Sequence, residues 1–368
     1  MRIGYLVHNL NDPAVERRCR MFALGGAEIA LAGFCRDAAL SDGIAGFNPL
    51  VVGRSEDAAF VKRAVATVRA ALFHGQLDHH FAACETLVAR NLEQLAIARS
   101  IVGERPLVYE CLDIHRSLVG TGLAAQLVQR VEGMLLPRVD LLMTSSPAFV
   151  RNHFAGTTLD ARIELVENKL LVEDDDFSLS NPCEPVFPIR IGWFGMLRCK
   201  RTLGFLAQLA ADSHGRVEVL IAGKPSRAEL PDLEQVVERT PGLEFVGPYR
   251  YSDLPALYGR CHFAWTIDWF EEGMNSSWLL PNRLYEPLAY GVVPIALRDV
   301  EVGRWLASND VGMLVASGNE ARERLLSMDM KELASLQQGA RHVDREKLIA
   351  DRSDCIGLVK MLSEVGSQ

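Results

Sequence analysis

The feature that most constrains the fold is a series of short apolar runs separated by helical patterns. In the first part of the 368-residue chain, polar residues or turn formers bound each apolar run. Such runs are typical of parallel strands in a sheet that helices cover on both faces. The expected strands are 3–7, 28–34, 50–52, 86–89, 106–111, 141–144 and 163–166, and the expected helices lie near 13–25, 57–73, 91–102, 121–137 and 146–154.

An acidic segment rich in serine and proline, 173–188, interrupts this series and predicts a linker between domains. We predict an α/β protein with two Rossmann-like, doubly wound domains, 1–175 and 186–343, and a last helix within 344–368 that packs back on the first domain. Ligands then bind at the carboxyl ends of the strands. The second series of strands is 189–194, 217–222, 243–246, 262–267, 292–297 and 313–315, with helices at 201–211, 227–239, 252–259, 282–290, 300–307, 319–341 and 344–364.

Composition excludes several classes of protein. The net charge is −8 and no basic stripe is visible, which argues against a nucleic-acid partner. The eight cysteines are scattered without a C-x-x-C pair, so we expect reduced thiols and no zinc or disulfide framework. The first residues read as a strand and not as a signal peptide, and no apolar run is long enough to span a bilayer. We therefore expect a cytoplasmic protein and not a periplasmic-type binding protein.

The loop after the first strand argues against a nicotinamide enzyme. A dinucleotide-binding domain should show G-x-G-x-x-G directly after a strand. This chain instead has His8-Asn9-Leu10-Asn11-Asp12 there, and Gly25-Gly26 follows a helix, where it reads as a helix end.

The second domain carries a more specific pattern at its first strand end. Gly195, Arg198, Lys200 and Arg201 stand where the strand 189–194 gives way to a helix. Glycine lets a ligand approach the backbone, and a helix N-terminus attracts anions, so these cations could neutralise a diphosphate. The alternative is an ordinary solvated basic turn. Further glycine turns follow the next strands at Gly223-Lys224 and at Gly247.

A short helix expected at 282–290 adds a third group of polar residues. Glu286 lies about one turn after Asn282 and Arg283, so the three can share a face. A carboxylate in that position can accept both hydroxyls of a ribose, while Arg283 and the helix N-terminus meet phosphate.

The stretch from Glu286 to Pro294 resembles the E-x-x-A-x-G-x-P donor-site signature of GT-B glycosyltransferases, similar to glycosyltransferase family 4. The glycine turns match the same family in order, and the resemblance extends over nearly the whole chain, from the segment 11–18 to Asn168 and beyond. It implies two Rossmann-like domains facing across a cleft, and transfer of a hexosyl group from a nucleotide sugar to a glycan or a lipid-linked saccharide. It implies donor binding by Gly195, Arg198, Arg201, Gly223, Lys224, Asn282, Arg283 and Glu286.

Three positions depart from the family pattern. Trp278 stands where many members carry a second glutamate, Leu112 where many carry a histidine, and Met196 where many have an arginine. These changes leave stereochemistry and the phosphate contacts open. The segments 109–115 and 280–286 also resemble bacterial exopolysaccharide transferases of the succinoglycan type.

The acceptor side is expected at the end of the fifth strand, where Glu110, Asp113 and His115 are candidate catalytic residues. Asp113, at the start of the loop, is the first choice for a general base if partial burial raises its pKa. Alternatively, Asp113 caps the next turn and Glu110 pairs with an arginine, or a retaining reaction needs no protein base. The residues expected to contact the acceptor are His8, Asn9 and Arg90.

No metal and no cofactor is expected. The acidic run 174–176 could imitate a D-x-D metal motif, but it lies in the linker and reads as solvated. Two other functions remain open: a nucleotide-sugar epimerase of the same fold, and an inactive GT-B module that only binds.

One helix raises the possibility of membrane contact. The segment 60–73 is amphipathic, with Lys62, Arg63 and Arg69 off its apolar stripe. Packing on the sheet is the ordinary explanation. The sharper hypothesis is peripheral contact with an anionic membrane that carries a lipid-linked acceptor.

Overall fold

The computed structural model describes residues 1–35, 39–54, 67–114, 120, 122–173 and 183–366. The chain forms two compact units. Unit 1 contains Met1–Glu167, Leu171–Glu173 and Ala350–Gln368, and unit 2 contains Asn168–Leu170 and Asp174–Ile349.

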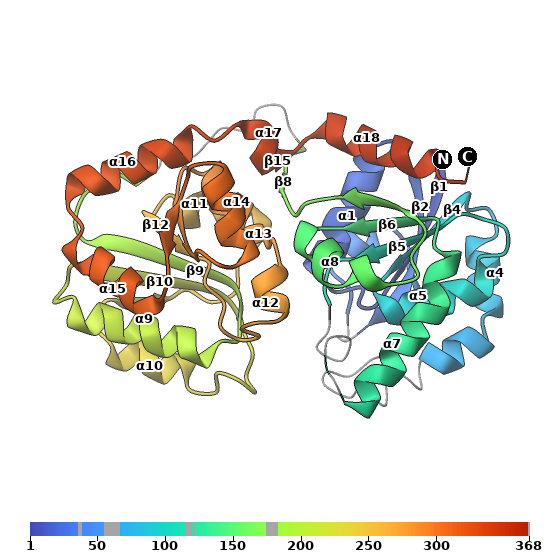
Figure 1. Ribbon diagram of the computed structural model, residues 1–368, viewed down its shortest axis with the longest axis horizontal. Helices are drawn as coiled ribbons and strands as arrows, with labels where there is room; N and C mark the ends of the chain where they lie inside the picture. The colour runs from blue at the N-terminus through green and yellow to red at the C-terminus, as the bar shows by residue number, and fades with distance from the viewer. Residues whose placement is uncertain (36–38, 55–66, 115–119, 121, 174–182, 367–368) are drawn as a thin grey trace. The chain divides into compact units, whose positions relative to one another are not determined.

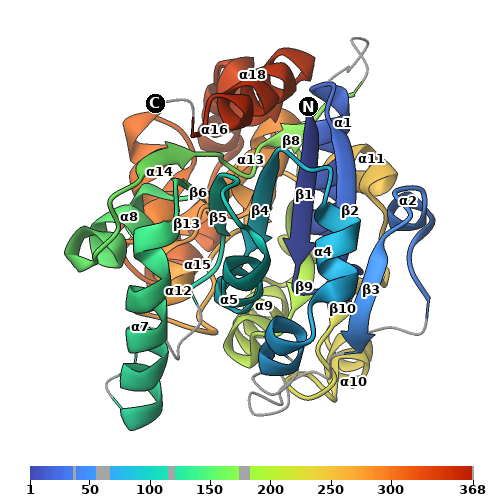
Figure 2. The same ribbon diagram turned by 90° about the vertical axis from the view of Figure 1, so that its right-hand side faces the viewer.

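Unit 1 is built on a seven-stranded sheet of order β3-β2-β1-β4-β5-β6-β7, in which all neighbours are parallel. The order reverses between β1 and β4, so the carboxyl ends of these two strands mark the switch point of the sheet. Figure 2 shows β1 and β4 side by side. The strands are β1 (Arg2–Val7), β2 (Glu28–Cys35), β3 (Leu50–Arg54), β4 (Thr86–Arg90), β5 (Leu107–Cys111), β6 (Leu141–Thr144) and β7 (Arg162–Leu165).

Helices cover both faces of this sheet (Figure 1). Alternation along β1 sends Ile3, Tyr5 and Val7 into the core below α1 and α18. Gly4 faces the other side, where an added Cβ would lie 2.9 Å from the Phe81 ring in α4. The helices are α1 (Pro13–Leu24), α2 (Asp42–Ala45), α4 (Gly75–Phe81), α5 (Leu92–Ile101), α7 (Leu123–Leu135), α8 (Pro147–Asn152) and α18 (Arg352–Ser363).

The start and the end of α1 follow from its sequence. Asp12 accepts a hydrogen bond from the Ala14 amide at 2.9 Å, and Pro13 occupies the first helical position. The helix ends at Gly25, followed by Gly26 at φ +86°, as expected. Gly25 also permits close packing, because a Cβ there would lie 2.3 Å from the Cys355 carbonyl of α18.

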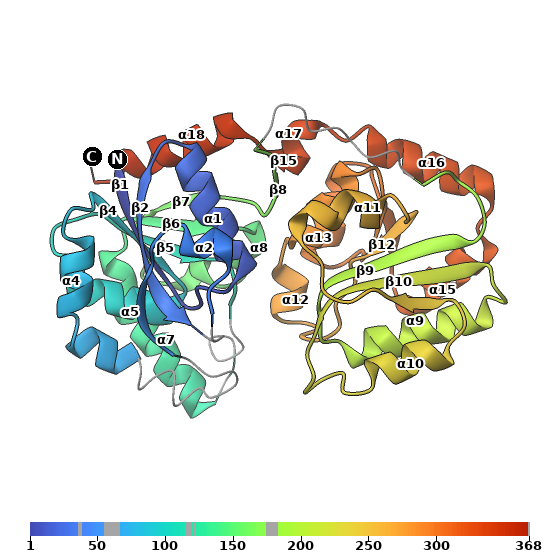
Figure 3. The same ribbon diagram turned by 180° about the vertical axis from the view of Figure 1, so that it is seen from behind.

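Unit 2 has a six-stranded parallel sheet of order β11-β10-β9-β12-β13-β14, with its switch point between β9 and β12. α9 and α10 lie on one face of this sheet and α13 on the other (Figures 1 and 3). The strands are β9 (Ile189–Leu197), β10 (Val217–Pro225), β11 (Leu243–Phe245), β12 (Phe263–Trp265), β13 (Val293–Leu297) and β14 (Met313–Val315). The helices are α9 (Lys200–Asp212), α10 (Leu233–Arg239), α11 (Leu254–Tyr258), α12 (Asn275–Trp278), α13 (Asn282–Ala289), α14 (Glu301–Ser308), α15 (Gly318–Ser327), α16 (Met330–Arg341) and α17 (Arg345–Leu348).

Several predicted helices differ from the observed ones. The expected helix 319–341 is two helices, because Asp329 accepts from the Glu332 amide and starts α16 anew. The expected helix 227–239 begins only at Leu233, since Pro231 disfavours helical geometry in the residue before it. The last helix is interrupted by β15 (Ile349–Ala350), which pairs with β8 (Leu170–Leu171).

Candidate functional site

Three glycines with positive φ lie along the carboxyl edge of the unit 2 sheet. Gly195, Gly223 and Gly247 have φ of +113°, +138° and +81°, values that L side chains rarely adopt. β9 and β10 run on to Leu197 and Pro225, so Gly195 and Gly223 lie within paired strands and not at the turns we expected. A Cβ on Gly223 would lie 1.8 Å from the Gly195 carbonyl oxygen, whereas a Cβ on Gly195 would meet open space. A ligand could therefore approach the Gly195 backbone closely.

Two of the expected cations meet on one carboxylate that the sequence did not single out. Asp268, after β12, receives a hydrogen bond at 2.6 Å from Arg283, and Arg198 lies 3.9 Å from the same oxygen. The other Asp268 oxygen accepts from the Phe270 amide at 3.0 Å. Burial opposes ionisation of Asp268, but Arg283, the Phe270 amide and Arg198 outweigh it and lower its carboxyl pKa. An acidic residue just beyond a strand end was the signal that could have found it.

Arg201 is the second residue of α9, the helix that follows β9 and Arg198. Its guanidinium pairs with Glu272 at 2.6 Å and lies 4.4 Å from the Trp269 ring centroid. Both charged side chains are more than half exposed, so solvent weakens this pair. Lys224, beside Gly223, is exposed and has no ion pair with any described residue.

Glu286 lies in a cluster of tyrosines. Glu286 is 7% exposed, and the Tyr258 hydroxyl donates a hydrogen bond to its carboxylate at 3.4 Å. Tyr258 stacks on Tyr290 with ring centroids 5.5 Å apart. Burial, followed by the Glu286 charge, raises the pKa of Tyr249, Tyr258 and Tyr290, which therefore stay protonated donors. The tyrosines were not predicted, because only the fold brings these positions around Glu286.

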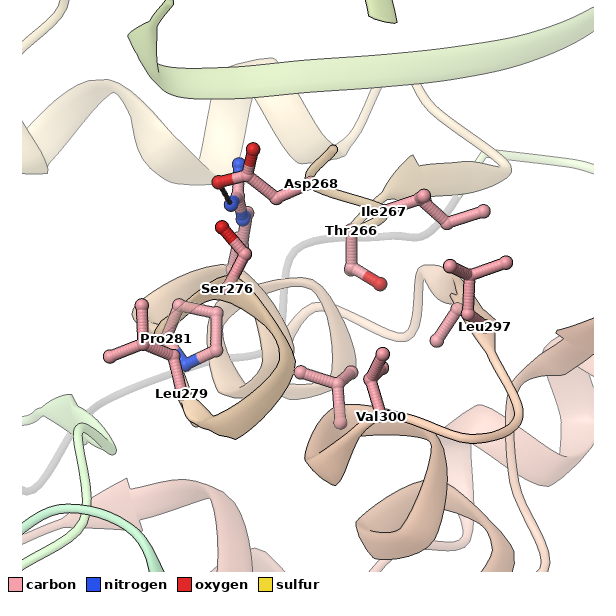
Figure 4. A pocket seen from close by; sticks show the side chains of 11 residues that line it. Thr266, Ile267, Asp268, Ser276, Leu279, Pro281, Leu297 and Val300 are labelled. Atoms are coloured by element: carbon pink, nitrogen blue, oxygen red, sulfur yellow. Dashed lines mark hydrogen bonds and ion pairs between the residues drawn. The ribbon is translucent and has the colours of Figure 1, made fainter. Parts of the chain in front are cut away.

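A pocket adjoins the Asp268–Arg283 pair, since both residues line it, and Figure 4 shows Asp268 among the lining side chains. It lies between the ends of β12 and β13 and the beginnings of α12, α13 and α14. The Thr266 hydroxyl is already occupied, since it donates to the Ile295 carbonyl at 2.6 Å. The lining residues are Thr266, Ile267, Asp268, Ser276, Leu279, Pro281, Arg283, Ala296, Leu297, Val300 and Val302. Asn282, a candidate donor ligand, is half-buried at the first position of α13.

In unit 1, the side chains near the switch point form a buried ion cluster. Glu110 is 0% exposed; it accepts from Arg18 at 2.7 Å and from the Tyr5 hydroxyl at 2.5 Å, and Arg90 lies 3.5 Å away. Burial opposes ionisation of Glu110, but the two arginines and Tyr5 outweigh it and lower its pKa. The carboxylate thus has no exposed surface to offer a substrate, which matches the alternative that Glu110 pairs with arginine.

Arg90 connects this cluster to the end of β1. It donates to the Tyr5 hydroxyl at 3.1 Å and lies 3.6 Å from Asp12. His8 lies 3.7 Å from the same Asp12 oxygen, and both of these side chains are about one quarter exposed. Arg90 was expected at the acceptor, but at 4% exposure it is almost fully enclosed by the protein.

The backbone at the end of β4 is strained. Asn91 has φ +73° and ψ 166°, a region that residues other than glycine rarely occupy. Such strain is often found at functional sites, and this residue lies at the switch point. Asn9 is partly buried and its side chain accepts from the Asn11 amide at 3.2 Å.

The remaining acceptor-side candidates lie beyond the end of β5. Asp113 is exposed and not partly buried as we expected of a general base, and its carbonyl accepts a weak bond from the Cys111 thiol at 3.9 Å. His115 lies outside the described residues, as do Asp174, Asp175 and Asp176 of the acidic run. Within the part of the chain that the structure describes, no group of three or more metal-ligating side chains occurs, and no helix is long and apolar enough to span a bilayer.

Comparison with known proteins identifies relatives of this chain. No protein-family model matches it. It is 37% identical over 382 residues to the succinoglycan biosynthesis protein ExoL of Rhizobium meliloti (strain 1021), which covers 100% of this chain and 94% of that protein.

Solved structures identify the fold. HepE of Anabaena, in complex with UDP and glucose, matches with a TM-score of 0.68 at 16% identity, over 100% of this chain and 99% of its own. WaaG, a glycosyltransferase involved in lipopolysaccharide biosynthesis, matches with a TM-score of 0.65 at 12% identity, over 100% of both chains. The GT-B fold that the sequence predicted is thereby confirmed.

Proposed function

The chain belongs to the family of the succinoglycan biosynthesis protein ExoL, and from that premise we propose that it is a glycosyltransferase of bacterial exopolysaccharide biosynthesis. Its donor is a nucleotide sugar and its acceptor a saccharide or a lipid-linked saccharide. The observation that carries the proposal is the edge of the unit 2 sheet. There the open backbone of Gly195 lies at the same switch point as a group of arginines, which includes Arg198 and Arg283.

Each part of this edge suits one part of a nucleoside diphosphate sugar. Arg198, Arg201 and Arg283, with the N-terminus of α13, supply positive charge and donors for the diphosphate. Glu286 accepts from the ribose hydroxyls, and Gly195 leaves room for the phosphates. HepE, which shares the fold, was solved with UDP and glucose, and this supports a uridine diphosphate sugar as the first donor to test.

The proposed reaction needs one proton acceptor. The acceptor hydroxyl oxygen attacks the anomeric carbon and loses its proton to Asp113, while the bond from that carbon to the phosphate oxygen breaks. The nucleoside diphosphate leaves with the electron pair, and the arginines stabilise its charge. We propose no metal and no cofactor, because guanidinium groups provide the positive charge. In a retaining reaction the leaving phosphate would take the proton instead of Asp113.

A thermal-shift screen over nucleotides and nucleotide sugars tests the donor. A ligand that binds only the folded state raises its stability by RT ln(1 + [L]/Kd), so about 2.7 kcal/mol at a hundredfold excess over Kd. We expect UDP and one UDP-sugar to raise Tm, and uridine to do so less. Radiolabelled transfer from that sugar to membrane lipid extracts then tests the reaction. Release of an epimerised sugar without any acceptor would instead identify an epimerase.

We further propose peripheral contact between unit 1 and the inner face of the cytoplasmic membrane. Apolar side chains at the start of α7 are open to solvent, with Leu123 86% and Leu127 63% exposed. Phe73, which follows the helical residues 67–72, is 79% exposed. The charges beside these residues, Arg69 and Arg130, are exposed and positive, which suits anionic lipid. Of the basic residues first considered, Lys62 and Arg63 lie outside the described residues.

Vesicle sedimentation tests this contact. We expect binding to vesicles that contain phosphatidylglycerol at low salt, and loss of binding when Leu123 and Leu127 are both changed to serine. Ile356→Ser removes a half-exposed apolar side chain from α18 and serves as the matched control, which should bind normally. Equal binding by all three proteins, or none by the wild type, would contradict the proposal.

A further inference from the structure

The carboxylate of Asp268 contacts two arginines, which come from opposite sides of the switch point. Arg198 follows β9, and Arg283 is the second residue of α13. The same Asp268 oxygen is 2.6 Å from Arg283 and 3.9 Å from Arg198. A guanidinium group binds carboxylate and phosphate oxygens in the same way. Asp268 therefore occupies, toward these arginines, the place of a phosphate oxygen.

Arg283 has donor capacity that Asp268 does not use. Its terminal nitrogen donates to Asp268, while its Nε is buried without a hydrogen-bond partner among the described residues. Leaving a buried donor unpaired is costly and uncommon in native proteins. A bidentate anion such as a phosphate group would satisfy both nitrogens of the fork.

The Asp268 side chain is only 8% exposed, so solvent screens its charge little. Glu272 offers a direct contrast on the same loop. It pairs with Arg201, but these side chains are 52% and 60% exposed and the pair is screened. Removing the negative charge of Asp268 should therefore change the affinity of the nearby arginines for an anion, whereas removing that of Glu272 should change it little.

We propose that Asp268 is the internal counter-ion of the donor site. It holds Arg198 and Arg283 in position and competes with the diphosphate for them, so it limits how tightly the product nucleoside diphosphate is held. Asp268 is thus a positioning residue that sets diphosphate affinity and product release. This inference rests on the proposed donor site, and goes beyond it by naming a residue that opposes binding.

The test compares wild type, Asp268→Asn and Glu272→Gln in binding to UDP, inorganic pyrophosphate and uridine. We expect Asp268→Asn to bind UDP and pyrophosphate roughly tenfold to a hundredfold more tightly, because the arginines gain one net charge in a partly buried site. Uridine affinity should stay unchanged. With an active donor, both KM and kcat should fall, since release of a tightly held product slows turnover. Glu272→Gln should change all affinities less than about threefold.

Weaker anion binding by Asp268→Asn would overturn the proposal, because it would indicate that the carboxylate only orients Arg283. Unchanged anion binding would also overturn it, because it would indicate that the carboxylate does not influence anion affinity. Asp268→Ser serves as a second variant, judged by the same affinities, if the asparagine variant does not fold. Tighter pyrophosphate binding without any nucleotide binding would support the counter-ion and reject the nucleotide-sugar donor. No binding of any anion to any of the proteins would reject both.

Discussion

Both units place arginines and carboxylates at the switch point of a parallel sheet, but the two groups differ in what they leave available. In unit 1, Glu110 and Arg90 are almost fully enclosed, and Tyr5 connects them. In unit 2, Arg198 and Arg283 share one carboxylate, and the Arg283 Nε has no hydrogen-bond partner in the part of the chain that the structure describes. The difference teaches that position at a sheet edge does not by itself make a binding group. A charged side chain at such an edge can bind a ligand only if the protein's own ion pairs and hydrogen bonds leave some of its donors or acceptors unused.

The largest effect is expected from Glu110→Gln. It would leave Arg18 and Arg90 buried with less negative charge, and breaking a buried ion pair costs about 3–5 kcal/mol of folding free energy. Urea denaturation followed by circular dichroism measures this loss. Glu244→Gln, which breaks the exposed pair with Arg260, is the control and should unfold as the wild type does. A stable Glu110→Gln protein without activity would instead restore Glu110 as a catalytic residue.

The same cluster predicts the pH dependence of stability. The folded-state pKa of Glu110 lies below its ordinary value of 4.5, so the folded state binds this proton less well than the unfolded state does. The stability that Glu110 contributes is therefore present above pH 4.5 and is lost as the pH falls through its folded-state pKa. Glu110→Gln should remove that part of the acid sensitivity.

The next effect concerns the exposed end of β5. Asp113→Asn should lower turnover about 10²–10⁴-fold, the usual contribution of a general base, while UDP affinity stays unchanged because the proposed donor groups all lie in unit 2. Steady-state transfer and calorimetric binding measure the two quantities separately. Asparagine keeps the shape and most hydrogen bonds of the side chain, so a purely capping role would leave turnover normal. Normal turnover would favour His115 or a reaction without a protein base.

A smaller effect separates the parts of the donor site. Glu286→Gln should weaken UDP binding by about 1.5–3 kcal/mol, the contribution of a hydrogen bond to a charged group, and leave pyrophosphate binding unchanged. Arg198→Ala should weaken both ligands, because it removes a phosphate contact and not a ribose contact. Titration calorimetry with the two ligands distinguishes the variants. If Glu286→Gln weakened pyrophosphate as much as UDP, the ribose assignment would be wrong.

The sequence predicted the strands well, because apolar runs such as 141–144 are the strand β6 to the residue. It was less informative about partners. Alternation along a strand puts neighbours such as Glu110 and Cys111 on opposite faces, but it cannot show that α1 brings Arg18 onto the face of Glu110. Asp268 was missed for a related reason: it directly follows the expected strand 262–267, but nothing in the sequence showed that Arg283 and Arg198 meet on its carboxylate. Pairings between elements depend on packing that no local pattern encodes.

The smallest expected effect is none at all, on treatment with EDTA. In many transferases a divalent cation neutralises the departing diphosphate, and removing it abolishes activity. In unit 2 we assign that task to Arg198, Arg201 and Arg283. A chelator does not remove the charge of these side chains. Arg18 and Arg90 of unit 1 could not take it over, since Glu110 and Asp12 already pair with them. We therefore expect the same transfer rate in excess EDTA and in added Mg²⁺ or Mn²⁺, measured with purified enzyme and a fixed donor concentration. Activity that vanished in EDTA and returned with either ion would show that the arginines are insufficient, and would move a metal ion into the donor site.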